Sequence, residues 1–172
     1  MAGAGRSRRG LSLVVLALLV WPLAGRIVEV GASQVPPARD GALRIVKAVR
    51  AAQETYRSVH GYYDRLECLV QDACVPNPYP PTYLATEDAR ATAHGYRFQL
   101  ADGPRASAGI DDFVSPTGMT AYALTVVPTS SGLAVGESTS FCADVEGIYE
   151  YADGHLPAVT AGRCIDRGTK LH

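Results

Sequence analysis

The sequence predicts an α+β domain in which an N-terminal amphipathic helix packs on a small antiparallel β-sheet and two disulfides secure the fold. Three observations predict this class. Apolar residues recur at spacings of three and four in residues 42–60, runs rich in β-branched and aromatic residues follow residue 95, and the 172-residue chain holds four cysteines. A helix followed by a loop and then by several strands is typical of the α+β class.

The predicted helix runs from Ala42 to His60. Asp40 is its expected N-cap, because a side-chain carboxylate satisfies free N–H groups at a helix start. Gly61 is its expected stop, because glycine readily adopts the backbone conformation that ends a helix. One apolar stripe is predicted to cover a face of the sheet: Ile45, Val46, Val49, Ala52, Tyr56 and Val59.

Three segments outside the strands are predicted to be irregular or only briefly helical. Residues 62–83 form a loop, because the prolines of the NPYPP stretch lack the N–H donors that a central strand needs. A short helical turn is predicted for residues 85–93. The glycine-containing stretch TSSGLAVGE, residues 129–137, is expected to be a flexible loop between strands, since neither a lysine nor a helix pattern follows it.

Four strands are predicted from runs such as YALTVV and IYEY, whose residue types pack well on pleated surfaces. The residues Val145-Glu146-Gly147 form a hairpin loop between the last two strands, and Asp153-Gly154 marks a further turn. The predicted strands are residues 96–100, 121–127, 140–144 and 148–151.

The four cysteines, Cys68, Cys74, Cys142 and Cys164, are predicted to form two disulfides, since an even number behind a leader-like N-terminus is typical of exported domains. The spacing favours Cys68–Cys74 and Cys142–Cys164, each of which closes a local loop. Four cysteines allow three connectivities, and the sequence does not choose among them. A zinc site is the rival interpretation, but the chain has no C-x2-C pair and its histidines cluster with neither cysteine pair.

The chain is predicted to have three parts. Residues 1–32 are a leader, either a hydrophobic signal or an anchor; residues 33–41 are a break that contains Pro36 and Pro37; and residues 42–172 are the globular domain. Residues 11–30 would contact the membrane if the leader is not removed.

Several export signals fit the first 32 residues. Arginines followed by a short apolar run fit a secretory signal peptide, with a small-residue cleavage site at 30–32. The arginine pair Arg8-Arg9 also resembles the start of a twin-arginine export signal. Arg9-Gly10-Leu11-Ser12-Leu13 resembles the leader of type IV pilins and type II secretion pseudopilins, in which a peptidase cuts after the glycine. The resemblance implies processing between Gly10 and Leu11, although the family places a glutamate where this chain has Val15.

Two further stretches are similar to the same family. Residues 51–56, AAQETY, and Gly61-Tyr62-Tyr63 resemble the end of the long pilin helix and the glycine–aromatic pair beyond it. GYRF at 95–98 and SFCADVEGIYEYADG at 140–154 are similar to the closing hairpin of pilin-like proteins, which end with a second cysteine such as Cys164.

The resemblance implies a pilin-like head that is exported and non-enzymatic, with other pilin or pseudopilin subunits as partners. It would be a structural or accessory subunit of a type IV pilus or a type II secretion pseudopilus. The expected location is the inner membrane facing the periplasm, or the periplasm or medium after cleavage. The alternative is a freely soluble, exported binding domain that signal peptidase releases.

No chemistry-bearing motif points to an enzyme, and no cofactor or metal is predicted. The chain lacks a G-x-S-x-G motif, and His60, His155 and His172 are expected to be solvated and structural. Asp111-Asp112, with Asp102, could hold calcium, but their spacing favours a solvated acidic loop. Nucleic acid is not an expected partner, because the 16 basic and 17 acidic residues nearly balance and no basic run follows the first ten residues.

Overall fold

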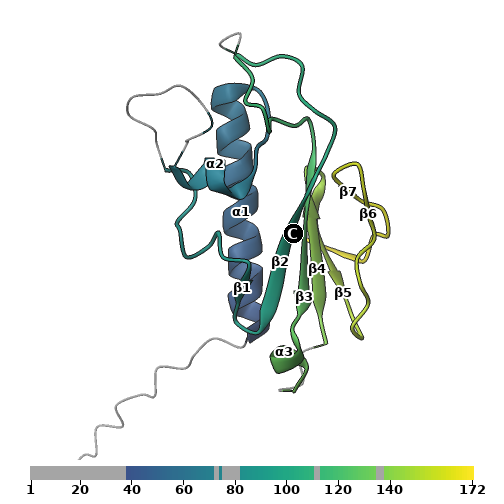
Figure 1. Cartoon of the computed structure of the whole chain (residues 1–172). Helices are drawn as coiled ribbons and strands as arrows, with labels where there is room; N and C mark the ends of the chain where they lie inside the picture. Colours follow the sequence, from purple (N-terminus) through teal and green to yellow (C-terminus); the bar gives the residue numbers. More distant parts are fainter. Residues whose placement is uncertain (1–37, 72–73, 75–81, 111–112, 135–137) are drawn as a thin grey trace, which may run out of the picture. The chain divides into compact units, whose positions relative to one another are not determined.

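Helix α1, Ala38–His60, lies along one face of an antiparallel β-sheet (Figure 1). In this computed structural model the described residues are 38–71, 74, 82–110, 113–134 and 138–172, and all belong to one compact unit. The predicted leader, residues 1–32, and the prolines of the predicted break lie outside the described residues. No helix in the described part of the chain is both long enough and apolar enough to cross a bilayer.

Helix α1 begins one turn before the predicted start. Asp40 lies inside the first turn of α1 and not at the flanking cap position, so the prediction of Asp40 as the N-cap is wrong. At this place its negative charge interacts favourably with the helix dipole. Gly41 is inside the helix because the His94 ring packs against it: a Cβ at Gly41 would lie 2.7 Å from His94 Cγ. Close packing thus offsets the low helix propensity of glycine at this position.

The predicted apolar stripe of α1 is confirmed except at its last member. Five of its residues are at most 3% exposed, whereas Val59 is 45% exposed. The stripe packs against alternate residues of the central strands, among them Leu124, Val126 and Phe141. Burial of this apolar area, worth about 25 cal/mol per Å², holds the helix on the sheet.

Among the described residues, the main sheet has six strands in the order β1-β2-β3-β4-β5-β8, with every neighbouring pair antiparallel. Each predicted strand is found, with ends that differ by at most two residues. The hairpin between β4 and β5 has a two-residue loop, since Asp144 pairs with Gly147, which is one residue shorter than predicted. The strands are β1 (Thr92–Ala93), β2 (Tyr96–Asp102), β3 (Tyr122–Pro128), β4 (Ser140–Asp144), β5 (Gly147–Tyr151) and β8 (Thr169–Leu171).

Three predicted irregular segments contain regular structure. The predicted loop 62–83 includes helix α2, Leu66–Gln71, and the predicted flexible loop 129–137 includes the short helix α3, Ser130–Ala134. The predicted helical turn at 85–93 is confirmed only in its first half: the N–H groups of Asp88 and Ala89 donate to carbonyls three residues earlier, whereas residues 92–93 form β1. β1 pairs with β2 through a tight turn at His94-Gly95, whose φ angles of 52° and 78° suit a two-residue hairpin.

The sheet face opposite α1 carries a small ribbon of two strands, β6 (Val159–Thr160) and β7 (Arg163–Cys164). The predicted turn that precedes the ribbon is confirmed, with φ values of 56° at Asp153 and 69° at Gly154. A second apolar cluster fills the space between ribbon and sheet: Ala123, Cys142, Tyr149, Tyr151 and Cys164, with Val159 packed against it.

Candidate functional site

Both predicted disulfides are present, with the connectivity that the spacing favours. Cys68 bonds Cys74 across a separation of six residues, and Cys142 bonds Cys164 across 22. No cysteine is left free. Two disulfides in one small domain indicate an oxidising compartment, extracellular or periplasmic.

A buried carboxylate, Asp64, organises the region where α1 ends and α2 begins; we call its contacts the Asp64 network. Asp64 is 0% exposed. Its Oδ1 accepts hydrogen bonds from the Arg65 N–H at 2.8 Å and from the Thr117 hydroxyl at 2.6 Å. The Tyr56 hydroxyl donates to Oδ2 at 3.4 Å. The Gln53 amide donates to the Asp64 carbonyl at 2.6 Å and accepts from its N–H at 3.2 Å.

The Asp64 network joins α1, the start of α2 and the loop before β3. The same loop is fixed by two more contacts: the Ser115 N–H donates to the Tyr62 hydroxyl at 3.0 Å, and Tyr63 and Met119 exchange backbone hydrogen bonds of 2.9 and 2.8 Å. Because nearly every donor and acceptor here is satisfied internally, the network is a rigid support for α2 and not a binding site.

Asp64, Cys68 and Cys74 are grouped as metal ligands would be, with ligand atoms within 4.8 Å of one another. Both sulfurs are bonded to each other in the disulfide. Cysteine binds a metal as the thiolate, so in the disulfide-bonded protein only the Asp64 carboxylate of this group is available as a ligand.

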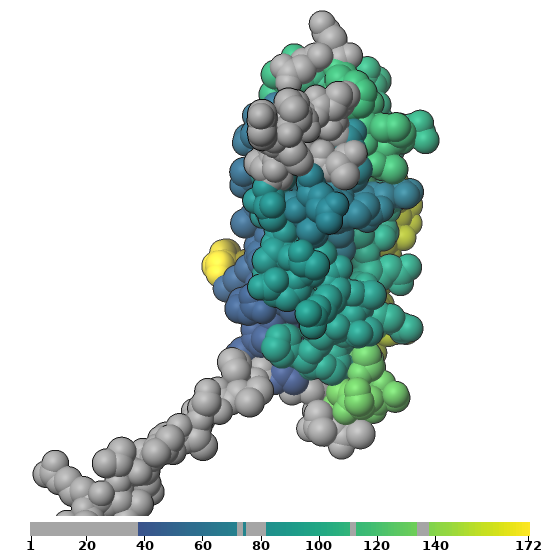
Figure 2. Space-filling model, turned by 60° about the vertical axis from the view of Figure 1, so that its left-hand side comes forward, coloured from purple at the N-terminus to yellow at the C-terminus, as the bar shows by residue number. Residues whose placement is uncertain are grey.

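The candidate site is a groove of about 900 Å³ between α2 and β2, which we call the α2–β2 groove. Figure 2 views the molecule from this side, with α2 and residues 82–102 toward the reader. Apolar side chains of Leu66 and Val70 form one wall, and Phe98 and Leu100 form the other. The remaining lining residues are Arg65, Glu67, Gln71, Cys74, Thr86, Ala89, Arg90, Ala91 and Asp102.

An ion pair joins the two walls of the α2–β2 groove. Arg65 Nη2 lies 2.8 Å from Asp102 Oδ2, and this contact raises the pKa of the Arg65 guanidinium. Both side chains are about half exposed, so the pair adds little stability but positions charge at the rim. Asp102, which the sequence offered as a possible calcium ligand, is therefore already paired with the Arg65 guanidinium.

The α2–β2 groove has the chemistry of a binding surface. Its size and its apolar walls with a few polar residues at the rim match the usual features of ligand sites. Its described lining contains neither a histidine nor a free thiol that could serve as base or nucleophile. The edge of β2 adds backbone hydrogen-bonding groups. The Phe98 N–H donates to the Ala91 carbonyl at 2.8 Å, on the side of β2 that faces β1. The backbone N–H and C=O of Leu100, two residues further along β2, point toward that same side.

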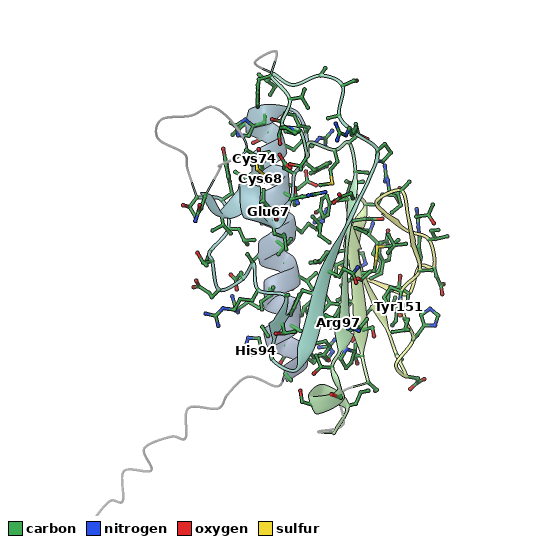
Figure 3. All side chains as sticks on the ribbon, viewed as in Figure 1. Glu67, Cys68, Cys74, His94, Arg97 and Tyr151 are labelled. Atoms are coloured by element: carbon green, nitrogen blue, oxygen red, sulfur yellow. A yellow bond between two sulfur atoms is a disulfide. The ribbon has the colours of Figure 1, made fainter. Side chains whose placement is uncertain are left out.

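The histidines do not all lie where the sequence predicted. His60 is only 8% exposed, which contradicts the expected solvated role. Its Nε2 lies 3.1 Å from the Tyr83 hydroxyl, and its ring centroid lies 4.3 Å from that of Tyr56. His155 is half exposed, pairs with Asp166 at 2.7 Å and stacks on Tyr151, which Figure 3 labels on β5.

The remaining predicted site residues lie outside the described part of the chain: Gly10, Leu11, Val15, Asp111 and Asp112. Sequence reasoning missed the Asp64 network. One signal was available in the sequence, because the polar residue Gln53 stands beside Ala52 of the apolar stripe of α1. The structure places Gln53 inside the fold, where it is 0% exposed. A polar residue at the border of such a stripe is typically hydrogen-bonded inside the fold.

Tyr122 carries a buried hydroxyl that has no hydrogen-bond partner among the described residues. The ring packs edge-on against Tyr63 with centroids 5.0 Å apart. Burial raises the pKa of the Tyr122 phenol, and the nearby Glu54 carboxylate raises it further. The native state therefore keeps this phenol neutral at pH values where the unfolded chain ionises it.

We expect Tyr122→Phe to raise the free energy of unfolding by about 1 kcal/mol, because the substitution removes an unsatisfied buried hydroxyl. Above about pH 10 an exposed tyrosine ionises, so the unfolded wild-type chain binds fewer protons than the native chain and stability falls as the pH rises. This fall should be shallower in Tyr122→Phe. Urea titrations from neutral to alkaline pH measure both effects.

The matched control for this test is Tyr62→Phe, which removes a hydroxyl that accepts from the Ser115 N–H. It should lower the free energy of unfolding by about 1 kcal/mol. Equal effects of the two substitutions would contradict the assignment of Tyr122 as the unsatisfied group.

Comparison with known proteins identifies no relative: no family model, no curated protein and no solved structure matches this chain.

Proposed function

We propose that this chain is an exported, non-enzymatic pilin-like protein that acts as a structural or accessory subunit of a type IV pilus or a type II secretion pseudopilus. Residues 11–30 would anchor it in the inner membrane with the head in the periplasm. The observation that carries the proposal is the placement of α1: the first described element is a 23-residue helix laid along an antiparallel sheet, and it follows the apolar leader in the chain.

The first turn of α1 is attached to the sheet, which would suit a head anchored through its N-terminal segment. Arg39 Nε and Nη2 donate to Glu150 Oε1 at 2.9 and 2.7 Å, which joins α1 to β5. The Arg39 guanidinium also lies 5.9 Å from the centroid of the Phe141 ring. Force applied through the N-terminal segment would pass to the sheet at this point, and not to the end of a free helix.

Mass spectrometry of the native protein tests the proposal. We expect a mature chain that begins at Leu11, with a methyl group on its N-terminal nitrogen, and that is recovered with membranes after a salt wash. Gly10→Val should leave the chain unprocessed, whereas Ala32→Asp, at the small-residue position that signal peptidase would need, should not affect processing. A chain that begins near Ser33 would contradict the proposal.

The second candidate is a soluble, exported binding domain with the same head, and the α2–β2 groove favours it. A groove of about 900 Å³ with apolar walls is large enough for a small molecule or a peptide segment. Val15, in place of the family's glutamate, also suits a protein that does not assemble. This candidate predicts cleavage near Ser33 and recovery as a monomer in the periplasm or medium.

A further inference from the structure

A second groove, of about 480 Å³, lies between α1 and the edge strand β8; we call it the α1–β8 groove. It is separate from the α2–β2 groove and shares none of its lining residues. In Figure 2 yellow residues of the C-terminal part of the chain emerge beside the blue helix α1. The lining residues are Lys47, Arg50, Ala51, Glu54, Glu146, Gly147, Ile148, Lys170, Leu171 and His172.

Three cations line the α1–β8 groove without an internal counterion. Lys47 and Lys170 are exposed, and Arg50 is partly exposed. Within the described part of the chain, no carboxylate forms an ion pair with any of the three. The Nε of Arg50 is buried and has no hydrogen-bond partner there. These cations are therefore available to an anionic group from outside the domain.

The two carboxylates of the groove lining are already engaged with other groups. Glu146 Oε1 lies 2.9 Å from Arg163 Nη1, and its Oε2 pairs with Arg167. Glu54 Oε1 accepts a hydrogen bond from the Tyr63 hydroxyl at 3.4 Å. The phenol leaves the charge of Glu54 in place, whereas Arg163 and Arg167 neutralise Glu146. Lys47, Arg50 and Lys170 therefore outnumber the one remaining side-chain carboxylate, and the groove lining has a net positive charge.

The second wall of the groove is the edge of the sheet. β8 pairs with β5 on one side and is the last strand in the sheet order, so its other side offers backbone groups among the described residues. The middle residue of β8 is Lys170, whose stem packs over Gly147: a Cβ on that glycine would lie 2.7 Å from Lys170 Cε. Lys170 is directly opposite Tyr149, so its side chain lies on the sheet face that carries the ribbon, whereas Lys47 and Arg50 lie on the α1 side of the same edge.

We propose that the α1–β8 groove binds an extended acidic segment of another protein, which adds to the sheet beside β8. Backbone hydrogen bonds to β8 would give affinity. Acidic side chains on the α1-facing side of the added strand would pair with Lys47 and Arg50, and acidic side chains on its other side would meet Lys170. Charge complementarity selects this occupant. A second copy of β8 would instead bring another Lys170 against the edge, and like charges disfavour such pairing.

An anionic membrane is the alternative source of negative charge. Lipid headgroups could neutralise the exposed lysines, but they cannot supply the strand that the β8 edge would accept. The test must therefore separate a requirement for extended peptide backbone from simple attraction between opposite charges.

The probe is a synthetic peptide with the repeat valine-glutamate-glutamate, labelled with a fluorophore, which places glutamates on both faces of an added strand. Two control peptides accompany it: one has proline at its centre with the same charge, and one has lysine in place of glutamate. Binding is measured by fluorescence anisotropy, and the contact residues by amide chemical shifts of the isotope-labelled, disulfide-intact protein. We expect the valine–glutamate peptide to bind, with shifts at Thr169–Leu171 and along the 47–54 segment of α1. Both control peptides should bind at least about tenfold more weakly.

Two double variants, each of which removes two positive charges, separate the effect of the groove lysines from the effect of net charge. Lys47→Gln with Lys170→Gln keeps most of each side-chain stem and should weaken binding of the valine–glutamate peptide about tenfold. Arg97→Gln with Arg105→Gln removes two exposed charges outside the groove and should leave binding unchanged. Circular dichroism and thermal unfolding confirm that both variants are folded.

Three results would overturn the proposal. The first is equal binding of the proline-containing acidic peptide, which would show charge attraction without strand addition. The second is equal weakening by the two double variants. The third is failure of the peptide to bind while vesicles with anionic lipid retain the wild-type protein and release the Lys47→Gln, Lys170→Gln variant. The maturation of the N-terminus does not enter these outcomes, so this inference and the proposed function can fail separately.

Discussion

Asp64→Ala is expected to lower the free energy of unfolding by about 3 kcal/mol, because it removes a buried, charged acceptor of three hydrogen bonds. The substitution removes the oxygen atoms that accept from the Arg65 N–H and the hydroxyls of Thr117 and Tyr56. The Asp64 side chain is completely buried, so the substitution also removes packed atoms from the interior of the fold. Urea unfolding of the disulfide-intact protein, followed by circular dichroism, measures the loss.

Two substitutions serve as controls for Asp64→Ala. Asp64→Asn keeps one acceptor oxygen and should cost about half as much, because the lost hydrogen bonds to a charged acceptor are only partly replaced. Glu67→Ala removes an exposed carboxylate three residues along the chain and should change stability by less than about 0.5 kcal/mol. A loss for Asp64→Ala as small as that for Glu67→Ala would show that the Asp64 network does not support the fold.

Removal of the Cys142–Cys164 disulfide is expected to destabilise the domain by about 3 kcal/mol, and removal of Cys68–Cys74 by about 2 kcal/mol. The longer loop accounts for the difference: 22 residues separate the first pair and six separate the second, so the first bond restricts the unfolded chain more. Double cysteine-to-alanine variants, compared with wild type in urea, measure the two losses. A larger loss for the Cys68–Cys74 variant would contradict the loop-closure argument.

The two disulfide variants should also differ in where they loosen the structure. Cys142 lies in β4 and Cys164 in β7, and both are almost completely buried with Tyr149 and Tyr151. Without this bond, hydrogen exchange should increase in β6 and β7, while the hydrogen bonds between β2 and β3 remain protected. Without Cys68–Cys74, the increase should be confined to α2, which that bond adjoins.

These variants also bear on the two grooves. The α2–β2 groove depends on the placement of α2, which the Asp64 network and the Cys68–Cys74 bond hold. The α1–β8 groove depends on α1 and on the pairing of β8 with β5. Loss of the Cys68–Cys74 disulfide should therefore leave binding of the valine–glutamate peptide intact, which separates the two surfaces experimentally.

The sequence by itself determined the features that depend on near neighbours in the chain. The stripe of α1 was predictable because a helix places every third or fourth side chain on one face. Strands β2, β3, β4 and β5 were predictable because residue type and alternation specify a pleated surface. Cys68–Cys74 and Cys142–Cys164 were the favoured pairs because chain proximity favours local closure, although the connectivity itself needed the structure.

Only the tertiary structure decided the features that depend on contacts between distant parts of the chain. Helix α2 forms within the segment 62–83, whose prolines suggested a loop. Asp64, two residues before the helix, fixes its start: the Asp64 carboxylate accepts a hydrogen bond from the Thr117 hydroxyl, and the Asp64 carbonyl accepts one from the Gln53 amide. His60 is buried because Tyr83 folds against it, and β8 is a strand only because β5 offers it a partner. Both grooves lie between elements far apart in the sequence. Their charge and shape arise from packing, which no local pattern of residues specifies.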